Sequence, residues 1–362
     1  MKRIFAGTAA ALLAAVLFLT VPAEAVSAEK AIVIDALTGR VLYERNADQQ
    51  SLIASTTKIM TALIVCEQCN VLDRMRIPKE AVGIEGSSMY LKEGEILTIQ
   101  ELLYGLMLSS GNDAAVALAI YCGGTVEGFA EMMNDKAHML GLTGTHFENP
   151  NGLDSPGHYS TARDLAVLAA YAMENPIFYK TVSAKNVTIG QRYLQNHNKL
   201  LWQVEGADGV KTGFTKAAGR ILVSSATRDG RRIITVTLND PNDWQDHGKL
   251  IESGFSGYVI QRIVNAGDTV GVLNVEGGEG SRVEVLAEEN CDFPLAAGEK
   301  PVLVLPGPGF VYSPVIRGAD AGYVYVVIDG NAVARIPVVY GETIEMENVE
   351  EPSIWERLLG GK

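Results

Sequence analysis

The sequence predicts an α/β (α+β) protein in which an antiparallel sheet flanked by helices is followed by a small all-β sandwich domain. Segments that alternate apolar and polar residues lie on both sides of a helical middle, which suggests one sheet built from the two ends of a domain. From about Val259 onward, short strands separated by turn residues replace the helical spacing.

Residues 1–25 have the pattern of a secretory signal peptide. Two basic residues precede an apolar stretch over residues 4–21, and Ala23-Glu24-Ala25 provides a cleavage motif. We expect cleavage after Ala25, or alternatively after Ala28. The mature protein would then be exported to the outer face of the cytoplasmic membrane or the cell-wall space, extracellular or periplasmic. A retained membrane anchor is the alternative, because the apolar stretch nearly reaches the roughly 20 residues of a span.

The first predicted domain covers residues 30–258 and contains two hairpins. The first spans residues 31–47 and turns at Thr38-Gly39, and the second spans residues 219–239 and turns at Asp229-Gly230. Because they lie at opposite ends of the domain, we expect them to meet in one sheet.

The segment ASTTKIMTALIVCE, residues 54–67, predicts a buried helix that carries Ser55 and Lys58. Side chains three residues apart share a helix face, so the hydroxyl and the amine can touch. The simpler alternative is a serine or threonine N-cap on a core helix. The spacing alone proves little, since Ser27 and Lys30 show it in a stretch without a helical pattern.

Two further polar islands interrupt apolar surroundings. Ser110-Gly111-Asn112 breaks the helical spacing over residues 97–121, and Lys211-Thr212-Gly213 precedes the second hairpin. A glycine at position 213 would let another backbone approach the strand closely. Between the islands, residues 160–173 predict a helix capped by Ser160 or Thr161.

Acyl transfer by a serine requires such groups together. The Ser55 hydroxyl becomes a nucleophile when a neutral Lys58 amine takes its proton. Lowering the pKa of Lys58 from about 10.4 to about 7 costs roughly 4.6 kcal/mol. A second cation about 4 Å away, in a medium of effective dielectric about 20, contributes about 4 kcal/mol. Burial contributes part of this shift, and Lys211 could by itself supply most of it.

The remaining polar groups then acquire roles. Ser110 could relay the proton to the leaving amine, and the Asn112 amide could hold Lys58 and the peptide carbonyl of the substrate. Lys211 and Thr212 offer a charge and a hydroxyl for a terminal carboxylate. The backbone N–H groups of Ser55 and Phe214 could form an oxyanion hole.

Composition limits the other possibilities. The formal charge of −13 argues against binding along nucleic acid. The five histidines are scattered, so no metal site is expected. Cys66 and Cys69 lack a second cysteine pair, so buried structural thiols are a better interpretation than a zinc or redox site, and the pairing of the four cysteines stays open. The other two are Cys122 and Cys291.

The C-terminal part divides into two segments. Residues 259–346 predict the all-β domain. Residues 347–362 form a tail in which Ile354, Trp355, Leu358 and Leu359 share one helical face. We expect this amphipathic tail to contact a membrane surface, and a solvated tail is the alternative.

The three motifs, in this order, resemble those of the penicillin-recognising serine enzymes. The flanking segments are similar to the low-molecular-mass penicillin-binding proteins that are serine-type D-alanyl-D-alanine carboxypeptidases. They include ASTTKIMTAL, GSSMYL, LLYGLMLSSGNDAAVALA, HFENPNGLD, HYSTARDLA and DGVKTGFT. The resemblance runs from about Ala31 to about Tyr258. The chain departs from the family at Ile53, where proline is common, and at Phe214, where some members have histidine.

The resemblance implies a β-lactamase/transpeptidase-like catalytic domain that removes the terminal D-alanine from peptidoglycan pentapeptide stems. It also implies an acyl-enzyme on Ser55, covalent inhibition by β-lactams and no cofactor. Its catalytic residues would be Ser55, Lys58, Ser110 and Asn112, and its substrate-binding residues Lys211, Thr212, Gly213 and Phe214.

Two alternatives remain. A class A β-lactamase would be expected to have Ser-Asp-Asn and a Glu-x-x-x-Asn loop, whereas this chain has Ser-Gly-Asn and only Glu148 in that region. A non-catalytic penicillin-sensing or cell-wall-binding module would be expected to have a broken motif.

Overall fold

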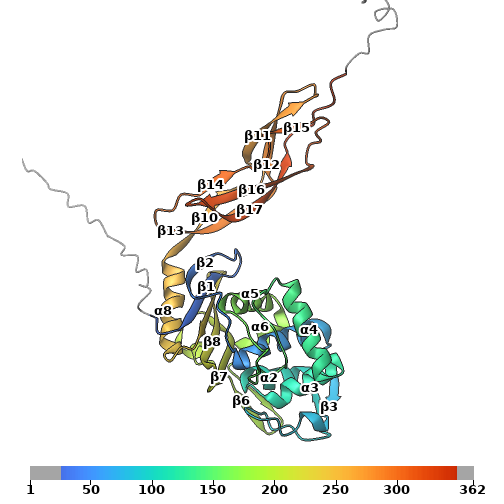
Figure 1. Cartoon of the computed structure of the whole chain (residues 1–362), viewed down its shortest axis with the longest axis vertical. Helices are drawn as coiled ribbons and strands as arrows, with labels where there is room; N and C mark the ends of the chain where they lie inside the picture. The colour runs from blue at the N-terminus through green and yellow to red at the C-terminus, as the bar shows by residue number, and fades with distance from the viewer. Residues whose placement is uncertain (1–25, 349–362) are drawn as a thin grey trace, which may run out of the picture.

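The computed structural model describes residues 26–348. The predicted signal peptide and nearly all of the predicted tail lie outside the described residues. An α/β domain and an elongated β domain follow one another along the long axis of the molecule (Figure 1). This architecture confirms the predicted fold class.

The α/β domain is built on a five-stranded antiparallel sheet with the strand order β2-β1-β9-β8-β7. The N-terminal hairpin joins the later strands where β1 pairs with β9, for example Ile32 with Val236. The sheet is therefore made from both ends of the domain. Its strands are β1 (Lys30–Asp35), β2 (Val41–Arg45), β7 (Ala207–Thr215), β8 (Gly219–Arg228) and β9 (Arg231–Leu238).

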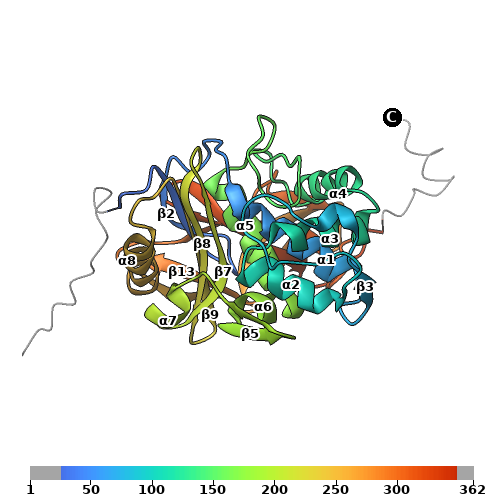
Figure 2. The same ribbon diagram turned by 90° about the horizontal axis from the view of Figure 1, so that it is seen from below.

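Helices cover both faces of this sheet. One face packs against α5 (Ala162–Met173) and α6 (Pro176–Ser183), and the other against α8 (Asp243–Ser256) (Figure 2). Because both faces are covered, every residue of β1 is buried instead of every second one. The N-cap of α5 is Thr161, one of the two predicted caps.

A central helix carries one of the motifs. The helix α1 (Lys58–Gln68) contacts α5, α6 and three further helices, and its residues 58–66 are all buried. A helix that is apolar around its whole circumference belongs inside a domain. The other three are α2 (Ile99–Leu108), α3 (Asn112–Gly123) and α4 (Val126–Met139).

Smaller elements complete the domain. The sequence did not predict the two small two-stranded sheets, β3–β4 and β5–β6. The bounds are η2 (Ala54–Thr57), β3 (Arg74–Arg76), η3 (Lys79–Ala81), β4 (Ile96–Thr98), β5 (Asn186–Ile189), β6 (Arg192–Gln195) and α7 (Leu200–Gln203).

The second domain contains only strands within its described residues. A six-stranded sheet has the order β14-β16-β17-β12-β11-β15, and β10 pairs separately with β13. Its core is rich in valine, including Val285, Val324 and Val338. The strands are β10 (Tyr258–Val264), β11 (Thr269–Glu276), β12 (Arg282–Ala287), β13 (Cys291–Ala296), β14 (Val302–Val304), β15 (Phe310–Tyr312), β16 (Asp320–Ile328) and β17 (Asn331–Tyr340).

The two domains meet at Arg40, in the turn after β1. Its guanidinium lies over the rings of Tyr258 and Phe293, 5.0 and 5.2 Å from their centroids. It also donates hydrogen bonds to the Pro294 carbonyl and the Glu299 carboxylate. Between residues 26 and 348, no helix combines the length and apolar character needed to cross a membrane.

Candidate active site

A pocket of about 280 Å³ brings the three predicted motifs together. Ser55 and Ser110 reach it from the helical part of the domain, and three residues of β7 reach it from the sheet. Lys58, Asn112 and Lys211 are buried next to it. The lining residues are Ser55, Ser87, Ser110, His197, Thr212, Gly213, Phe214, Arg220, Ile221, Asp243 and Trp244.

Two glycines allow the serine-bearing segment to fit. A Cβ on Gly213 would lie 3.2 Å from the Ile53 carbonyl oxygen and 3.3 Å from the Thr56 nitrogen, so β7 approaches η2 through a residue without a side chain. Gly152, at φ +84°, lies so close to Ala54 that a Cβ would overlap the Ala54 carbonyl. Ser55 is therefore held between a strand and a loop.

The Lys58 amine has three hydrogen-bond acceptors. Its Nζ lies 2.9 Å from Ser55 Oγ, 2.7 Å from Asn112 Oδ1 and 2.6 Å from the Asn151 carbonyl oxygen. The predicted contact between the serine and the lysine is thus present. The Asn151 carbonyl is a partner that the sequence did not indicate, since a backbone oxygen has no residue-type signal.

Burial lowers the pKa of Lys58 well below its usual value, and Lys211 lowers it further, whereas Asp113 raises it. The sequence suggested that Lys211 could supply most of this shift, with burial as a partial contribution. The order is the reverse, because Lys58 is completely buried and loses its hydration. Burial also lowers the pKa of Lys211, to about 7.

Ser110 and Asn112 lie at the junction of α2 and α3. Ser110 has a left-handed backbone, at φ +58°, which turns the chain sharply between the two helices. The Asn112 Nδ2 donates to the Glu85 carbonyl, which directs Oδ1 toward Lys58. Asp113 accepts hydrogen bonds from Ser88, Met89 and Leu91, and so fixes the loop that follows Glu85.

The loop that supplies Asn151 is attached to the first turns of α1. Thr61 Oγ1 donates to the Pro150 carbonyl at 2.7 Å, and Thr57 Oγ1 lies 2.7 Å from His158 Nε2. His158 Nδ1 accepts from the Glu148 N–H, so Nε2 carries the proton and donates to Thr57. Burial lowers the pKa of His158 to about 4.

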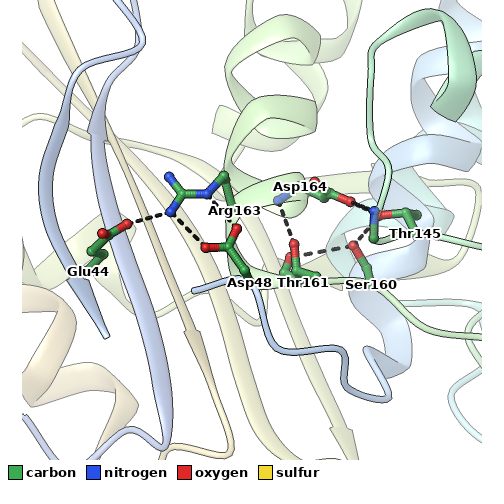
Figure 3. Close-up of polar contacts among 8 residues, drawn as sticks. Glu44, Asp48, Thr145, Ser160, Thr161, Arg163 and Asp164 are labelled. Atoms are coloured by element: carbon green, nitrogen blue, oxygen red, sulfur yellow. Dashed lines mark hydrogen bonds and ion pairs between the residues drawn. The ribbon is translucent and has the colours of Figure 1, made fainter. Parts of the chain in front are cut away.

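The start of α5 holds this loop from its other end (Figure 3). Asp164 Oδ2 accepts from the Gly144 N–H at 2.8 Å and from Thr145 Oγ1 at 2.7 Å. Next to it, Arg163 pairs with Asp48 and with Glu44 on β2. Figure 3 shows the two sets of contacts side by side, so α5 connects the sheet to the loop.

The β7 motif is divided between pocket and interior. Thr212, Gly213 and Phe214 line the pocket, and Phe214 is exposed. Lys211 is buried and donates to the Thr212 carbonyl at 3.0 Å. Lys211 is not among the described residues that line the pocket. The prediction that it offers a charge to a terminal carboxylate therefore lacks support from its position.

The cation that does line the pocket is Arg220, which the sequence analysis missed. Arg220 lies on β8 directly opposite Phe214, and counting residues across the strand pair would have located it. Its Nη2 donates to both carboxylate oxygens of buried Asp243 at 2.8 Å, and its guanidinium lies 5.7 Å from the Trp244 ring centroid. The side chain is still 43% exposed.

Other sequence features lie elsewhere. In the second Ser-x-x-Lys, the Ser27 hydroxyl donates hydrogen bonds to Asp240 and Asp246. Lys30 pairs with Glu29 instead of with Ser27. Glu148 is exposed, and its carboxylate accepts from Ser155. No group of three His, Cys, Asp or Glu side chains in residues 26–348 is placed to hold a metal ion.

Comparison with known proteins gives consistent matches. A family model described as D-alanyl-D-alanine carboxypeptidase, Peptidase_S11, matches residues 18–242. The D-alanyl-D-alanine carboxypeptidase DacC of Escherichia coli is 34% identical, over 94% of this chain and 88% of that protein. DacF of Bacillus subtilis is 31% identical, over 88% and 86%.

Solved structures agree with these matches. Penicillin-binding protein 5 of Haemophilus influenzae has a TM-score of 0.78 at 30% identity, covering 88% of this chain and 98% of that one. The Streptomyces K15 DD-transpeptidase has a TM-score of 0.62 at 36% identity, covering 64% of this chain and 98% of that one. The first similarity extends over both domains, and the second over a part the size of the α/β domain.

Proposed function

This chain belongs to the Peptidase_S11 family of D-alanyl-D-alanine carboxypeptidases, and from that membership we propose how its own residues carry out the reaction. The protein is a serine-type D-alanyl-D-alanine carboxypeptidase, a hydrolase and a penicillin-binding protein. Its substrates are peptidoglycan stem peptides that end in D-Ala-D-Ala.

The three oxygens around Lys58 are the observation that carries the mechanism. The Asn112 and Asn151 oxygens can only accept hydrogen bonds, whereas the Ser55 hydroxyl can also donate. A neutral amine has two N–H groups and one lone pair. When the two N–H groups point at the two carbonyl oxygens, the lone pair faces the Ser55 hydroxyl. Lys58 is therefore the base that takes the proton from Ser55.

Acylation then proceeds at Ser55. Its Oγ attacks the carbonyl carbon of the penultimate D-alanine, and the backbone N–H groups of Ser55 and Phe214 stabilise the oxyanion. The proton passes through Ser110 to the nitrogen of the leaving D-alanine. Asn112 keeps Lys58 in place. Water, activated by Lys58, hydrolyses the ester and restores the enzyme.

Arg220 and Thr212 bind the carboxylate of the leaving D-alanine. The support for this assignment is position: both line the pocket, and Arg220 is a partly exposed cation held by Asp243. A guanidinium anchored on one edge still presents donors to a carboxylate on another. Lys211 instead lowers the pKa of Lys58 by charge repulsion.

A β-lactam reacts with the same serine and stays attached. Its leaving group remains tethered beside the ester and obstructs the approach of water. Glu148, the carboxylate that a β-lactamase interpretation would need, is exposed and bonded to Ser155. We expect a penicilloyl adduct that persists for minutes or longer in intact-mass spectra. Turnover within seconds would favour a β-lactamase.

We also propose that the protein is exported and loses residues 1–25. Cleavage after Ala25 is supported by the packing of the next residues, since Val26 and Ala28 are buried and the Ser27 N–H bonds to Asp246. The tail would then rest on a membrane surface. Sedimentation with lipid vesicles, with and without residues 351–362, tests that contact.

Ser55→Ala tests the assignment. It removes the nucleophile for both reactions, so we expect loss of covalent labelling by a fluorescent penicillin and a fall of at least about a thousandfold in D-alanine release. Ser27→Ala is the matched control, because it changes the serine of the other Ser-x-x-Lys. It should label normally. Labelling of Ser55→Ala at the wild-type rate would exclude Ser55 as the nucleophile.

A further inference from the structure

Two helices that carry active-site residues lie next to each other and run in the same direction. The first residue of α1, Lys58, bonds to the first residue of α3, Asn112. About 10 residues later, or ~15 Å along each helix, both end in a cysteine. Cys69 is the C-cap of α1, and Cys122 is the last residue but one of α3. The two helices are in contact between these ends (Figure 2).

The two cysteines lie at the adjoining ends of these helices. Cys69 and Cys122 are both half-buried, and each thiol influences the ionisation of the other. Their surroundings are fixed as well, since Tyr121 donates to the Asp73 carboxylate at 3.0 Å and the Cys69 N–H donates to the Val65 carbonyl at 3.0 Å. The contact thus joins two anchored pieces of backbone.

Of the four cysteines, Cys122 is the one whose ionisation is favoured. The neighbouring Cys69 lowers the pKa of the Cys122 thiol, and Cys122, together with burial, raises the pKa of Cys69. Burial raises the pKa of Cys66 to about 12, and burial also raises the pKa of Cys291. An attacking thiolate next to a second thiol is the arrangement that oxidation requires.

We propose that Cys69 and Cys122 form a disulfide that ties the end of α1 to the end of α3. The bond closes a loop that contains α2 and Ser110. It therefore connects, at their far ends, the two helices that place Lys58 and Asn112 in the active site. Cys66, one helical turn before Cys69, stays a buried thiol.

The bond forms by two exchanges with a disulfide oxidant, either a small-molecule or a protein disulfide. The Cys122 thiolate attacks one sulfur of the oxidant and expels the other as a thiolate. Cys69 gives its proton to that thiolate and attacks Cys122 Sγ in the mixed disulfide, which expels the second sulfur. Two protein thiols are oxidised to one disulfide, and the oxidant is reduced to two thiols.

The test compares the full chain after reduction with the full chain equilibrated in oxidised glutathione. We expect the oxidised protein to lose about 2 Da in intact mass and to yield a cross-linked peptide pair containing Cys69 and Cys122. Its melting temperature should rise by roughly 5–10 °C over that of the reduced form, because the cross-link restricts the unfolded chain. Ser55 should react with penicillin in both forms.

Three variants locate the bond. Cys69→Ser and Cys122→Ser should each lose the cross-linked peptides and the redox-dependent melting shift, whereas Cys66→Ser should keep both. The proposal is wrong if wild-type protein keeps four alkylatable thiols, if it carries only glutathione adducts, or if Cys66 is the partner of either cysteine. Equal melting temperatures for the oxidised and reduced forms would contradict the proposed tie between the helices.

Discussion

The charge of Lys58 depends on three influences within a few residues of the reaction. Complete burial disfavours the ammonium most strongly, and Lys211 adds repulsion, whereas Asp113 favours the charged form. The two causes that lower the pKa outweigh Asp113. The lowered pKa therefore favours the neutral amine of Lys58 beside Ser55, where a base is needed.

Lys211→Gln should move the pH dependence of acylation. Without the neighbouring cation, the pKa of Lys58 rises, so Lys58 stays protonated up to a higher pH. The acid limb of the second-order rate of penicillin labelling, measured from pH 5 to 9.5, should shift to higher pH. The exposed Lys216 in the turn after β7 provides the matched control, and Lys216→Gln should leave the midpoint unchanged. An unchanged midpoint in Lys211→Gln would mean that Lys211 does not influence the pKa of Lys58.

At the scale of elements, the loop beside the active site depends on the first turn of α5. Asp164 lies in that turn and accepts hydrogen bonds from the Gly144 N–H and the Thr145 hydroxyl. The loop that contains these two residues also supplies the Asn151 carbonyl to Lys58. The contacts of Asp164 at the start of the loop therefore help to position the Asn151 carbonyl, which accepts a hydrogen bond from Lys58.

Asp164→Ala leaves the Gly144 N–H and the Thr145 hydroxyl without this acceptor. Each of the two lost, partly buried bonds costs about 1–3 kcal/mol, so we expect a loss of roughly 2–6 kcal/mol in the free energy of unfolding and slower penicillin acylation. Urea denaturation and labelling kinetics measure the two effects. Asp48→Ala is the control, because Asp48 contacts the adjacent Arg163 but is 73% exposed. Its effect should be within about 1 kcal/mol. Equal effects of both variants would contradict the role of Asp164.

At the scale of the whole molecule, two buried histidines make folding sensitive to acid. His158 and His247 have pKa values lowered by burial to about 4 and about 3. His247 lies between Ser224 and Thr237, which connects α8 to the middle of the sheet. Each histidine binds a proton more weakly in the folded chain than in the unfolded one. Their contribution to stability is complete above about pH 6.5 and is lost as the pH falls toward 4.

With a pKa of about 6.5 in the unfolded chain, each histidine should lower the free energy of unfolding by about 2 kcal/mol at pH 5 relative to pH 7.5. We expect the free energy of unfolding in urea to fall by about 4 kcal/mol between these two pH values. His158→Gln should show about half of that fall, whatever its stability at pH 7.5. His138 is an exposed histidine, so His138→Gln should retain the full difference. An identical fall in His158→Gln and wild type would show that other groups cause it.

Much of this molecule follows from local patterns. The three-residue spacing of Ser55 and Lys58, the break at Ser110-Gly111 and the alternation in β8 and β9 each depend on neighbours along the chain. The sheet formed from both ends of the domain also follows, because two hairpins with apolar faces need a common partner. Gly213 was predicted to admit another backbone, and η2 lies against it.

Other properties were decided only by packing. Burial lowers the pKa of Lys58 more than Lys211 does. That burial results from the packing of five other helices around α1. Arg220 reaches the pocket through strand register and is held there by Asp243, 23 positions away. The end of α1 that carries Cys69 lies beside the end of α3 that carries Cys122, because the two helices pack against each other. Sequence spacing determines which residues share a face, whereas desolvation and contacts between distant residues depend on how those faces are brought together.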